Sequence, residues 1–261
     1  MFSRSTLQLL VSSTSWLESA PALWLQLLIV AAWLGFVLLL AEGLNRSKWA
    51  EPEAVRKVIH IGTGNVILLA WWFQIPSWVG IAASILFSAV TLLSYRVALL
   101  PSLNSVGRKS LGTFFYAVSI GILIAFFWQQ QPQYAVLGIL VMTWGDGLAA
   151  LVGQRWGRHR YKLWDVEKSW EGSLTMAIAS YLVSSLILLS LQGNIWQTWA
   201  VAGAIALTAT GLEAFSKFGI DNLTVPLGSA ILGFALNQAL LEDPMLEDLM
   251  LMVVNCCGLQ G

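Results

Sequence analysis

Long apolar segments dominate this sequence and limit the folds open to it. A run of about 20 apolar residues is long enough to cross the ~30 Å hydrocarbon core of a bilayer as a helix. Only 11% of the residues are charged, against roughly 25% in ordinary soluble domains. The runs are continuous, unlike the short alternating segments of a membrane barrel. The sequence therefore predicts an all-α integral membrane protein, a bundle of about seven or eight transmembrane helices. The apolar runs lie at 22–42, 58–75, 77–95, 110–128, 133–153, 173–192, 195–213 and 221–241.

The polar segments between these runs are too short for a second folded domain, so we expect residues 1–261 to form a single transmembrane domain. Residues 1–20 are rich in serine but lack a cleavage site and the arginine density of a transit peptide. We expect them to be a mature, interfacial N-terminus. The two cysteines, Cys256 and Cys257, are adjacent, a spacing that fits neither a disulfide framework nor a metal site.

The basic residues predict which way the bundle faces. Thirteen of the 14 Lys and Arg residues fall on alternate loops, and Arg4 alone falls on the other side. By the positive-inside rule, the basic side is cytoplasmic (or stromal in a plastid), and both termini lie outside. The acids also gather near the basic side. We therefore expect any site to open to the cytoplasm, and we expect no nucleic-acid partner.

Asp146 stands about two turns inside the cytoplasmic end of the fifth apolar run. An unpaired carboxylate at the bilayer centre costs roughly 2.5–3.5 kcal/mol on insertion scales, and less near the interface. Asp146 therefore needs a partner. Ala150 and Gly153 share its helical face, so either another helix or a ligand can approach it closely. The placement alone leaves open a structural acid, paired or pore-lining, and a functional one.

The segment GQRWGRHRYKLWDVEKSWEG, residues 153–172, is the most charged loop of the chain. Its cations alone could be explained as anchors to anionic lipid headgroups. The end of the segment suggests a phosphate-binding site, because Lys168 and Gly172 stand just before an apolar helix, with Ser169 and Ser173 as N-cap candidates. A lysine, a helix N-terminus and free backbone N–H groups together form a phosphate cradle. With Asp146 nearby, carboxylates for Mg²⁺ and cations for phosphates would hold a nucleoside triphosphate.

Neither a GxxxxGK[ST] nor a GxGxxG motif occurs, so this phosphate site would be of another kind. Three motifs together resemble the CTP-dependent polyprenol kinase family, which groups phytol, farnesol and dolichol kinases with the CTP-dependent diacylglycerol kinase of yeast. The likeness covers roughly residues 50–240, and the short chain and the WGDGLAALVG segment look most like phytol kinases of cyanobacteria and plastids. The motifs are D-x-x-A-x-x-x-G with K-x-x-E-G (Asp146, Ala149, Gly153, Lys168, Glu171, Gly172), RKVIHIGTG (56–64) and DNLTVPL (221–227).

The resemblance implies a CTP-dependent kinase that phosphorylates phytol, geranylgeraniol or a related isoprenoid alcohol in the membrane, and whose product feeds phytyl diphosphate and tocopherol synthesis. It implies Mg²⁺ held by Asp146 and Glu171, with Asp221 as a further ligand. Lys168 would neutralise phosphates, and His60 or Asp146 would accept the alcohol proton. The other expected nucleotide contacts are Arg56, Lys57, Gly153, Arg155, Ser169 and Gly172.

Two other functions stay open from the residues alone. A CDP-lipid synthase also binds CTP and Mg²⁺ beside a lipid but attacks the α-phosphorus. An ion-coupled transporter predicts internal repeats and mid-membrane charges in several helices, whereas here the acids gather at one face. Without the resemblance, His60 is typical of a satisfied interfacial residue and Asp221 of an N-cap. Glu213 and Lys217, four residues apart, are typical of a surface pair.

Overall fold

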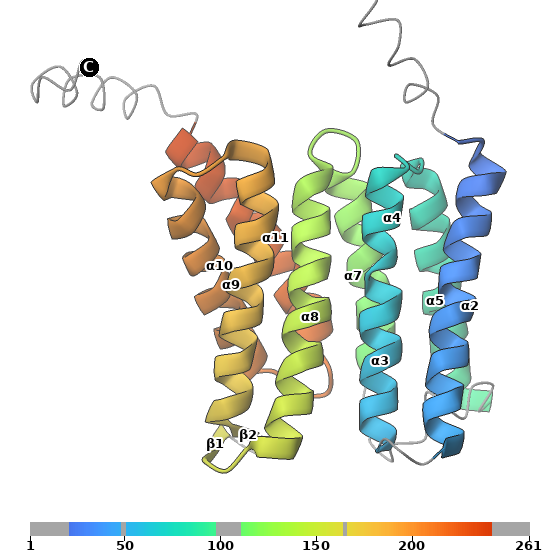
Figure 1. The fold of residues 1–261 in the computed structure, drawn as a ribbon, viewed down its shortest axis with the longest axis horizontal. Helices are drawn as coiled ribbons and strands as arrows, with labels where there is room; N and C mark the ends of the chain where they lie inside the picture. Colours follow the sequence, from blue (N-terminus) through green and yellow to red (C-terminus); the bar gives the residue numbers. More distant parts are fainter. Residues whose placement is uncertain (1–20, 48–50, 98–110, 164–165, 242–261) are drawn as a thin grey trace, which may run out of the picture.

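A computed structural model describes residues 21–47, 51–97, 111–163 and 166–241. Within these ranges the chain is a bundle of roughly parallel and antiparallel helices with one short hairpin at one end (Figure 1). The prediction of an all-α membrane bundle is confirmed. Residues 1–20, Cys256 and Cys257 lie outside the described residues. The elements are α2 (Leu23–Ser47), α3 (Pro52–Gly64), α4 (Val66–Trp72), α5 (Ser77–Val97), α7 (Gly112–Phe127), α8 (Pro132–Trp156), β1 (Arg160–Leu163), β2 (Val166–Ser169), α9 (Trp170–Gln192), α10 (Trp196–Ala214) and α11 (Asp221–Leu241).

Each predicted apolar run corresponds to a helix. In the described part of the chain, α2, α5, α8, α9 and α11 are long and apolar enough to cross a membrane, and α7 is a shorter apolar helix. The second run differs, because its helix begins at Pro52 and is divided at Asn65 into α3 and α4. Asn65 keeps helical backbone angles and its N–H donates to the Ile61 carbonyl, so α4 continues in the direction of α3 (Figure 1).

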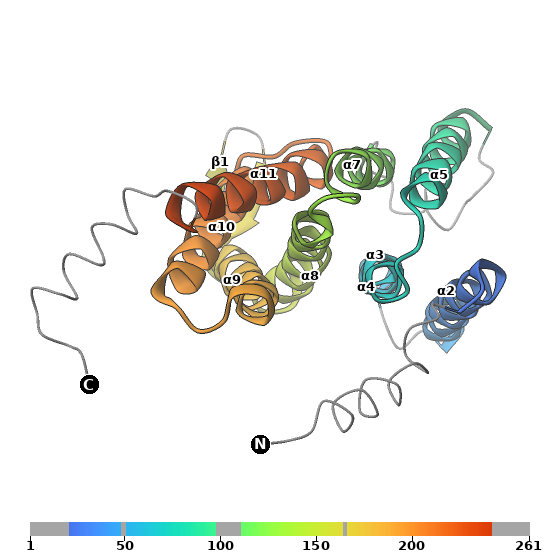
Figure 2. The same cartoon turned by 90° about the horizontal axis from the view of Figure 1, so that it is seen from above.

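Helix α8 is the centre of the bundle. Helices α3, α7, α9 and α11 all pack against it, while α2 and α5 lie at the edge (Figure 2). Of the most apolar window of each helix, 72% is buried in α8 but only 11% in α2 and 17% in α5. A residue on α8 is therefore surrounded by other helices, whereas most side chains of α2 and α5 are left to face lipid.

The segment 153–172, expected to be a loop, contains three kinds of structure. It holds the last turn of α8, an antiparallel pairing of β1 with β2, and the first turn of α9. The hairpin rests on α9 through Tyr161, whose hydroxyl lies 2.6 Å from Ser173 Oγ and whose ring lies 5.1 Å from that of Trp170. We call the end of the bundle that carries this hairpin the hairpin end. The ends of α2, α8 and α10 and the starts of α3, α9 and α11 meet there (Figure 1).

Candidate active site

A buried ion pair joins α3 to α8 near the hairpin end. Lys57 Nζ donates to Asp146 Oδ2 at 2.5 Å, and the two side chains are 2% and 13% exposed. The carboxylate therefore has the partner that its position in the membrane requires. The partner comes from RKVIHIGTG, so two of the sequence motifs meet at this contact.

His60, one turn after Lys57 on α3, faces the same carboxylate. Its Nε2 lies 3.6 Å from Asp146 Oδ2, too far for a hydrogen bond. That nitrogen is buried and has no hydrogen-bond partner among the described residues. The imidazole packs on the ring of Tyr116 from α7, with 4.5 Å between the ring centroids. His60 thus presents an unsatisfied ring nitrogen to the centre of the cluster.

A short hydrogen-bond chain fixes the position of Tyr116. Its hydroxyl lies 2.6 Å from Thr143 Oγ1, and Thr143 donates to the Ile139 carbonyl at 2.6 Å. The Thr143 proton is therefore used, so Tyr116 is the donor to Thr143. Gly64 makes room for this pair, because a Cβ there would overlap both hydroxyl oxygens. The last glycine of RKVIHIGTG is thus explained by close helix packing, as is common at helix contacts in membranes.

Arg56 flanks the cluster on the first turns of α3. Its guanidinium pairs with Glu53, with Nε donating to Oε2 at 2.8 Å. The hydrogen bond to Glu53 raises the pKa of Arg56 above its ordinary value, and the charges of Asp146 and Asp221 act in the same direction. Arg56 is therefore in the electrostatic field of both acids and remains a cation.

Lys168, at the end of the hairpin, reaches across to the end of α10. Its Nζ donates to Glu213 Oε1 at 2.5 Å and also to the Glu213 carbonyl. The two side chains are only 15% and 12% exposed. The interpretation of Glu213 as one half of a surface pair with Lys217 is therefore wrong. The spacing of four residues suggested that pair, but the fold turns Glu213 inward toward the hairpin.

Asp221 opens α11 beside these groups. Its N–H donates to Ser216 Oγ at 2.9 Å, and its Oδ1 accepts from the backbone and side-chain nitrogens of Asn222 at 3.1 and 3.2 Å. Electrostatic interactions link it to Asp146, Lys57 and Lys168, and link Glu213 to both aspartates. The hairpin end thus gathers three acids and two lysines from α3, α8, β2, α10 and α11.

Glu171 takes a different place from the one expected for it. Its Oε1 lies 2.7 Å from His159 Nδ1, and both carboxylate oxygens accept from the His159 backbone N–H. Among the interactions of the described residues, none joins Glu171 to Asp146. The structure brings Asp221 and Glu213, rather than Glu171, into the neighbourhood of Asp146.

The glycines and serine of the basic segment lie at the crossing of α8 and α9. A Cβ on Gly172 would stand 3.4 Å from the Gly153 Cα, so the two glycines let the backbones approach closely. Ser169 is confirmed as the N-cap of α9, because its Oγ accepts from the Gly172 N–H at 3.1 Å. Ser173 is not a cap and instead contacts Tyr161. Arg155 lies in the last turn of α8, exposed, with its guanidinium 5.5 Å from the Trp156 ring centroid.

Sequence reasoning missed Glu213, Tyr116 and Thr143 as members of the site. Glu213 carried a signal, since a carboxylate at the end of an apolar run needs a partner as much as Asp146 does. The sequence gives no comparable signal for Tyr116 and Thr143, because tyrosine and threonine are ordinary in apolar helices.

The geometry so far defines a polytopic helical membrane protein with a charged, partly buried cluster at one end. No family model matches the chain, and no solved structure matches it. Phytol kinases are among its curated relatives. It is 54% identical over 217 residues to the phytol kinase of Synechocystis sp., covering 83% of this chain and 93% of that one. It is 28% identical to a probable chloroplastic phytol kinase 1 of Oryza sativa subsp. japonica, covering 75% and 68%. It is 25% identical to the chloroplastic phytol kinase 1 of Arabidopsis thaliana, covering 74% and 69%.

The chain belongs to the phytol kinase family. This confirms the resemblance that the three motifs carry, and with it the expectation of a phosphotransferase that acts on an alcohol.

Proposed function

We propose that this protein transfers the γ-phosphoryl group of CTP to phytol, or to a closely related isoprenoid alcohol, at the hairpin end of the bundle. The observation that carries the proposal is the 54% identity to a phytol kinase over most of both chains. The product, an isoprenoid monophosphate, would feed phytyl diphosphate and tocopherol synthesis. The location suits the chemistry, because a lipid alcohol dissolves in the bilayer while a nucleotide comes from water.

The acids of the cluster fit a magnesium ion that arrives with the nucleotide. Within the described residues, no three His, Cys, Asp or Glu side chains are grouped closely enough to hold a metal. Mg²⁺ needs no such group, since it usually keeps several waters and binds one or two carboxylates together with substrate phosphates. Asp146 and Asp221 are the carboxylates that would hold it, and Glu213 is a third candidate. When bound, the ion would neutralise charge that develops on the phosphates.

Glu171, the ligand expected from the sequence, is less suited to bind Mg²⁺, because both of its carboxylate oxygens already accept hydrogen bonds from His159. We propose instead that Glu171 fastens the hairpin to α9. In this way it would position Lys168, which lies in β2 and donates to Glu213.

The two lysines are the groups that would bind phosphate oxygens. Each is now neutralised by a carboxylate, Lys57 by Asp146 and Lys168 by Glu213. When a phosphate and a divalent cation bind together, both lysine–carboxylate pairs would break. Each lysine would then pair with a phosphate oxygen, and each carboxylate would pair with the metal ion. The exchange keeps every buried charge compensated, which the low dielectric of the site demands. Arg56 and Arg155 remain candidates for outer contacts to the nucleotide.

His60 is the base that the geometry favours. Asp146 already accepts from Lys57, whereas His60 Nε2 is buried and has no partner in the described part of the chain. In the proposed reaction, the alcohol proton moves to His60 Nε2 while the alcohol oxygen bonds to the γ-phosphorus. The bond from that phosphorus to the bridging oxygen breaks, and CDP leaves. Positioning and charge compensation supply most of the rate enhancement in such transfers.

The hairpin end is the cytoplasmic or stromal side in this proposal, since the basic residues of the sequence gather there. The test of function uses membranes that contain the protein, phytol, and CTP labelled at either the α or the γ phosphate. The γ label should enter a lipid product and the α label should not. Transfer of the α label would instead indicate a CDP-lipid synthase, and transfer of neither would exclude both enzymes.

A further inference from the structure

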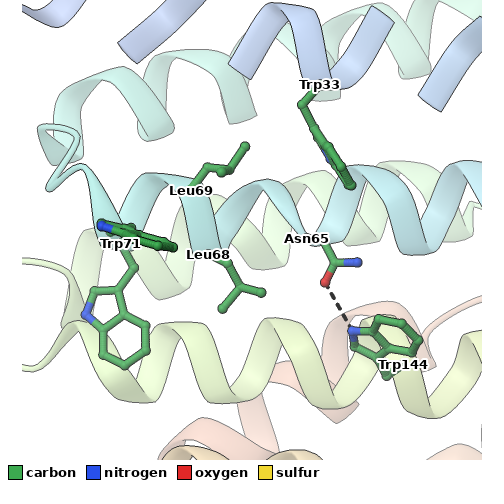
Figure 3. Close-up of a pocket in the computed structure, with 7 residues that line it drawn as sticks. Trp33, Asn65, Leu68, Leu69, Trp71 and Trp144 are labelled. Carbon is green, nitrogen blue, oxygen red and sulfur yellow. Dashed lines mark hydrogen bonds between the residues drawn. The ribbon is translucent and has the colours of Figure 1, made fainter. Parts of the chain in front are cut away.

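An apolar groove lies along the α3–α4 helix, where residues of α2 and α8 complete its walls. Its volume is about 760 Å³ and its lining is almost entirely hydrocarbon and indole. Four tryptophans and two leucines form its walls, and the side chain of Asn65 lies at one end, where its Oδ1 accepts from Trp144 Nε1 at 3.1 Å (Figure 3). The lining residues come from α2 (Trp33), the α3–α4 helix (Asn65, Leu68, Leu69, Trp71, Trp72) and α8 (Trp144).

The groove has a direction relative to the candidate active site. It runs along α4 away from the hairpin end, from Asn65 toward Trp71 (Figure 3). Asn65 follows His60 by five positions, about 7.5 Å along a helix axis. Between them, Ile61 packs on Gly147, where a Cβ would come within 2.7 Å of the isoleucine. The groove and the charged cluster therefore share α3 and α8 and differ in depth within the bundle.

The walls suit a hydrocarbon chain that enters from the membrane. The groove lies between the peripheral helix α2 and the central helix α8 and is open on one side. Trp33 holds α2 in place, because its Nε1 donates to the Gly62 carbonyl at 2.8 Å. Trp72, at the far end, is 84% exposed, as is typical of the interfacial tryptophans of a membrane protein. The flat indole faces and Leu68 offer a surface for a methyl-branched chain, and the amide of Asn65 lies at the end nearest the cluster.

We infer that this groove binds the isoprenoid chain of the acceptor alcohol, with its hydroxyl end past Asn65 toward His60 and Asp146 and its tail toward Trp72. The inference rests on the proposed function, which places an isoprenoid alcohol at the hairpin end. It adds the place where the chain is held and the residues that select it. A groove along the membrane normal aligns the tail with neighbouring lipids, and the hydroxyl then reaches the charged end of the bundle.

The first experiment measures binding without turnover. The protein, in dioleoylphosphatidylcholine vesicles and without nucleotide, is irradiated with an isoprenoid alcohol that carries a diazirine at its tail, and the labelled peptides are mapped. Label should fall on the Trp71 and Trp72 end of α4, and excess phytol should remove it. Label spread evenly over the lipid-facing helices, or label that phytol does not displace, would show ordinary bilayer lipid in the groove and overturn the inference.

The second experiment narrows the groove. Leu68→Trp fills it, because Leu68 is 40% exposed on its wall. About tenfold more phytol should then be needed to displace the label, while the KM for the nucleotide is unchanged. Leu182→Trp, on the lipid-facing side of α9 and 54% exposed, is the matched control and should change neither value. An equal loss of phytol competition in both variants, or no loss in Leu68→Trp, would overturn the inference.

Labelling and phosphoryl transfer, both measured on the wild-type protein, distinguish a failure of this inference from a failure of the proposed function. Wild-type protein that labels in the groove, with competition by phytol, but transfers no γ-phosphoryl group would support the groove and exclude the kinase. Wild-type protein that phosphorylates phytol but labels elsewhere would support the kinase and exclude the groove.

Discussion

Lys57 and Asp146 lie 89 positions apart in the sequence and meet in the bundle with 2.5 Å between Nζ and Oδ2. Lys57 is among the largest fully buried side chains of the described residues. Breaking a buried pair by removing one partner typically costs about 3–5 kcal/mol, because a charge is then left without compensation. The contact therefore has two roles that need to be separated, one in the stability of the bundle and one in catalysis.

A double substitution separates them. Asp146→Asn should lower the stability of the protein by roughly 3 kcal/mol or more, since Lys57 loses its counter-charge. The variant that combines Asp146→Asn with Lys57→Gln should regain most of that stability, because two neutral amides can hydrogen-bond to each other. Activity should remain at least about 10²-fold below wild type in both, since neither holds a metal or a phosphate.

The measurements are thermal unfolding in detergent and γ-phosphoryl transfer to phytol. If the double variant recovers activity together with stability, the pair is structural only, and the proposed site at Asp146 is excluded.

The Lys57–Asp146 pair also shows which features of the structure could be predicted from the sequence. The apolar runs predicted where the helices of the described residues lie, although one run is divided into α3 and α4, because crossing a bilayer imposes length and composition directly on the chain. The need of Asp146 for a partner was equally visible. Its partner was not, because a carboxylate in an apolar helix can pair with any cation that the fold brings close. Only the packing of α3 on α8 selects Lys57 rather than a lysine of the basic segment.

As half of an exposed pair, Glu213 could be replaced with little effect. Because the structure instead buries it against Lys168, we predict that its replacement lowers activity. Glu213→Gln leaves the largely buried Lys168 without its carboxylate and removes one acid from the cluster. Activity should fall about tenfold or more, as for other groups that stabilise transferring phosphates. The matched control is Glu167→Gln on β2, where the pair with Arg160 is 58% and 61% exposed. Exposed pairs are worth about 1 kcal/mol or less, so this change should be nearly silent. Equal activities in the two variants would exclude Glu213 from the site.

The hairpin shows a second limit of sequence reasoning. Strands of four residues that carry charged side chains are hard to tell from a solvated loop, and a membrane bundle gives no prior reason to expect a sheet. The Tyr161 contact to Ser173 and the His159 contacts to Glu171 fix the hairpin on α9. Both contacts join residues 12 positions apart, which only the folded turn brings together.

Gly64→Ala tests the packing of α3 on α8. The added methyl group would overlap Thr143 Oγ1 and the Tyr116 hydroxyl, so α3 must move away from α8. Overpacking of this kind typically costs about 1–3 kcal/mol. The variant should melt at a lower temperature and lose activity. Gly35→Ala on α2 is the control, because a Cβ there meets nothing within 4 Å, and its melting temperature should not fall.

The topology proposal can be tested with single cysteines after Cys256 and Cys257 are replaced by serine. Gln130 lies between α7 and α8, at the end opposite the hairpin, and His159 lies just before β1 with its side chain 80% exposed. An impermeant thiol reagent applied to intact cells should label Gln130→Cys. His159→Cys should react only after the membrane is opened. The reverse result would place the hairpin end outside and separate the charged cluster from the cytoplasmic nucleotide.

The last prediction concerns the unsatisfied nitrogen of His60. A positioned base contributes typically 10²–10⁴-fold to a rate, so His60→Gln should lower kcat by about that factor and leave the nucleotide KM nearly unchanged. Tyr116 acts through His60, so it is a positioning residue. Tyr116→Phe keeps the ring against the imidazole and should retain most activity, whereas Tyr116→Leu removes that support. In Tyr116→Leu, kcat should fall and the pH dependence of kcat should shift, because the imidazole is no longer held beside Asp146. The comparison of kcat, KM and pH profile across the three variants decides the role. If His60→Gln has a normal kcat, His60 is not the base, and Asp146 is the remaining candidate to accept the alcohol proton.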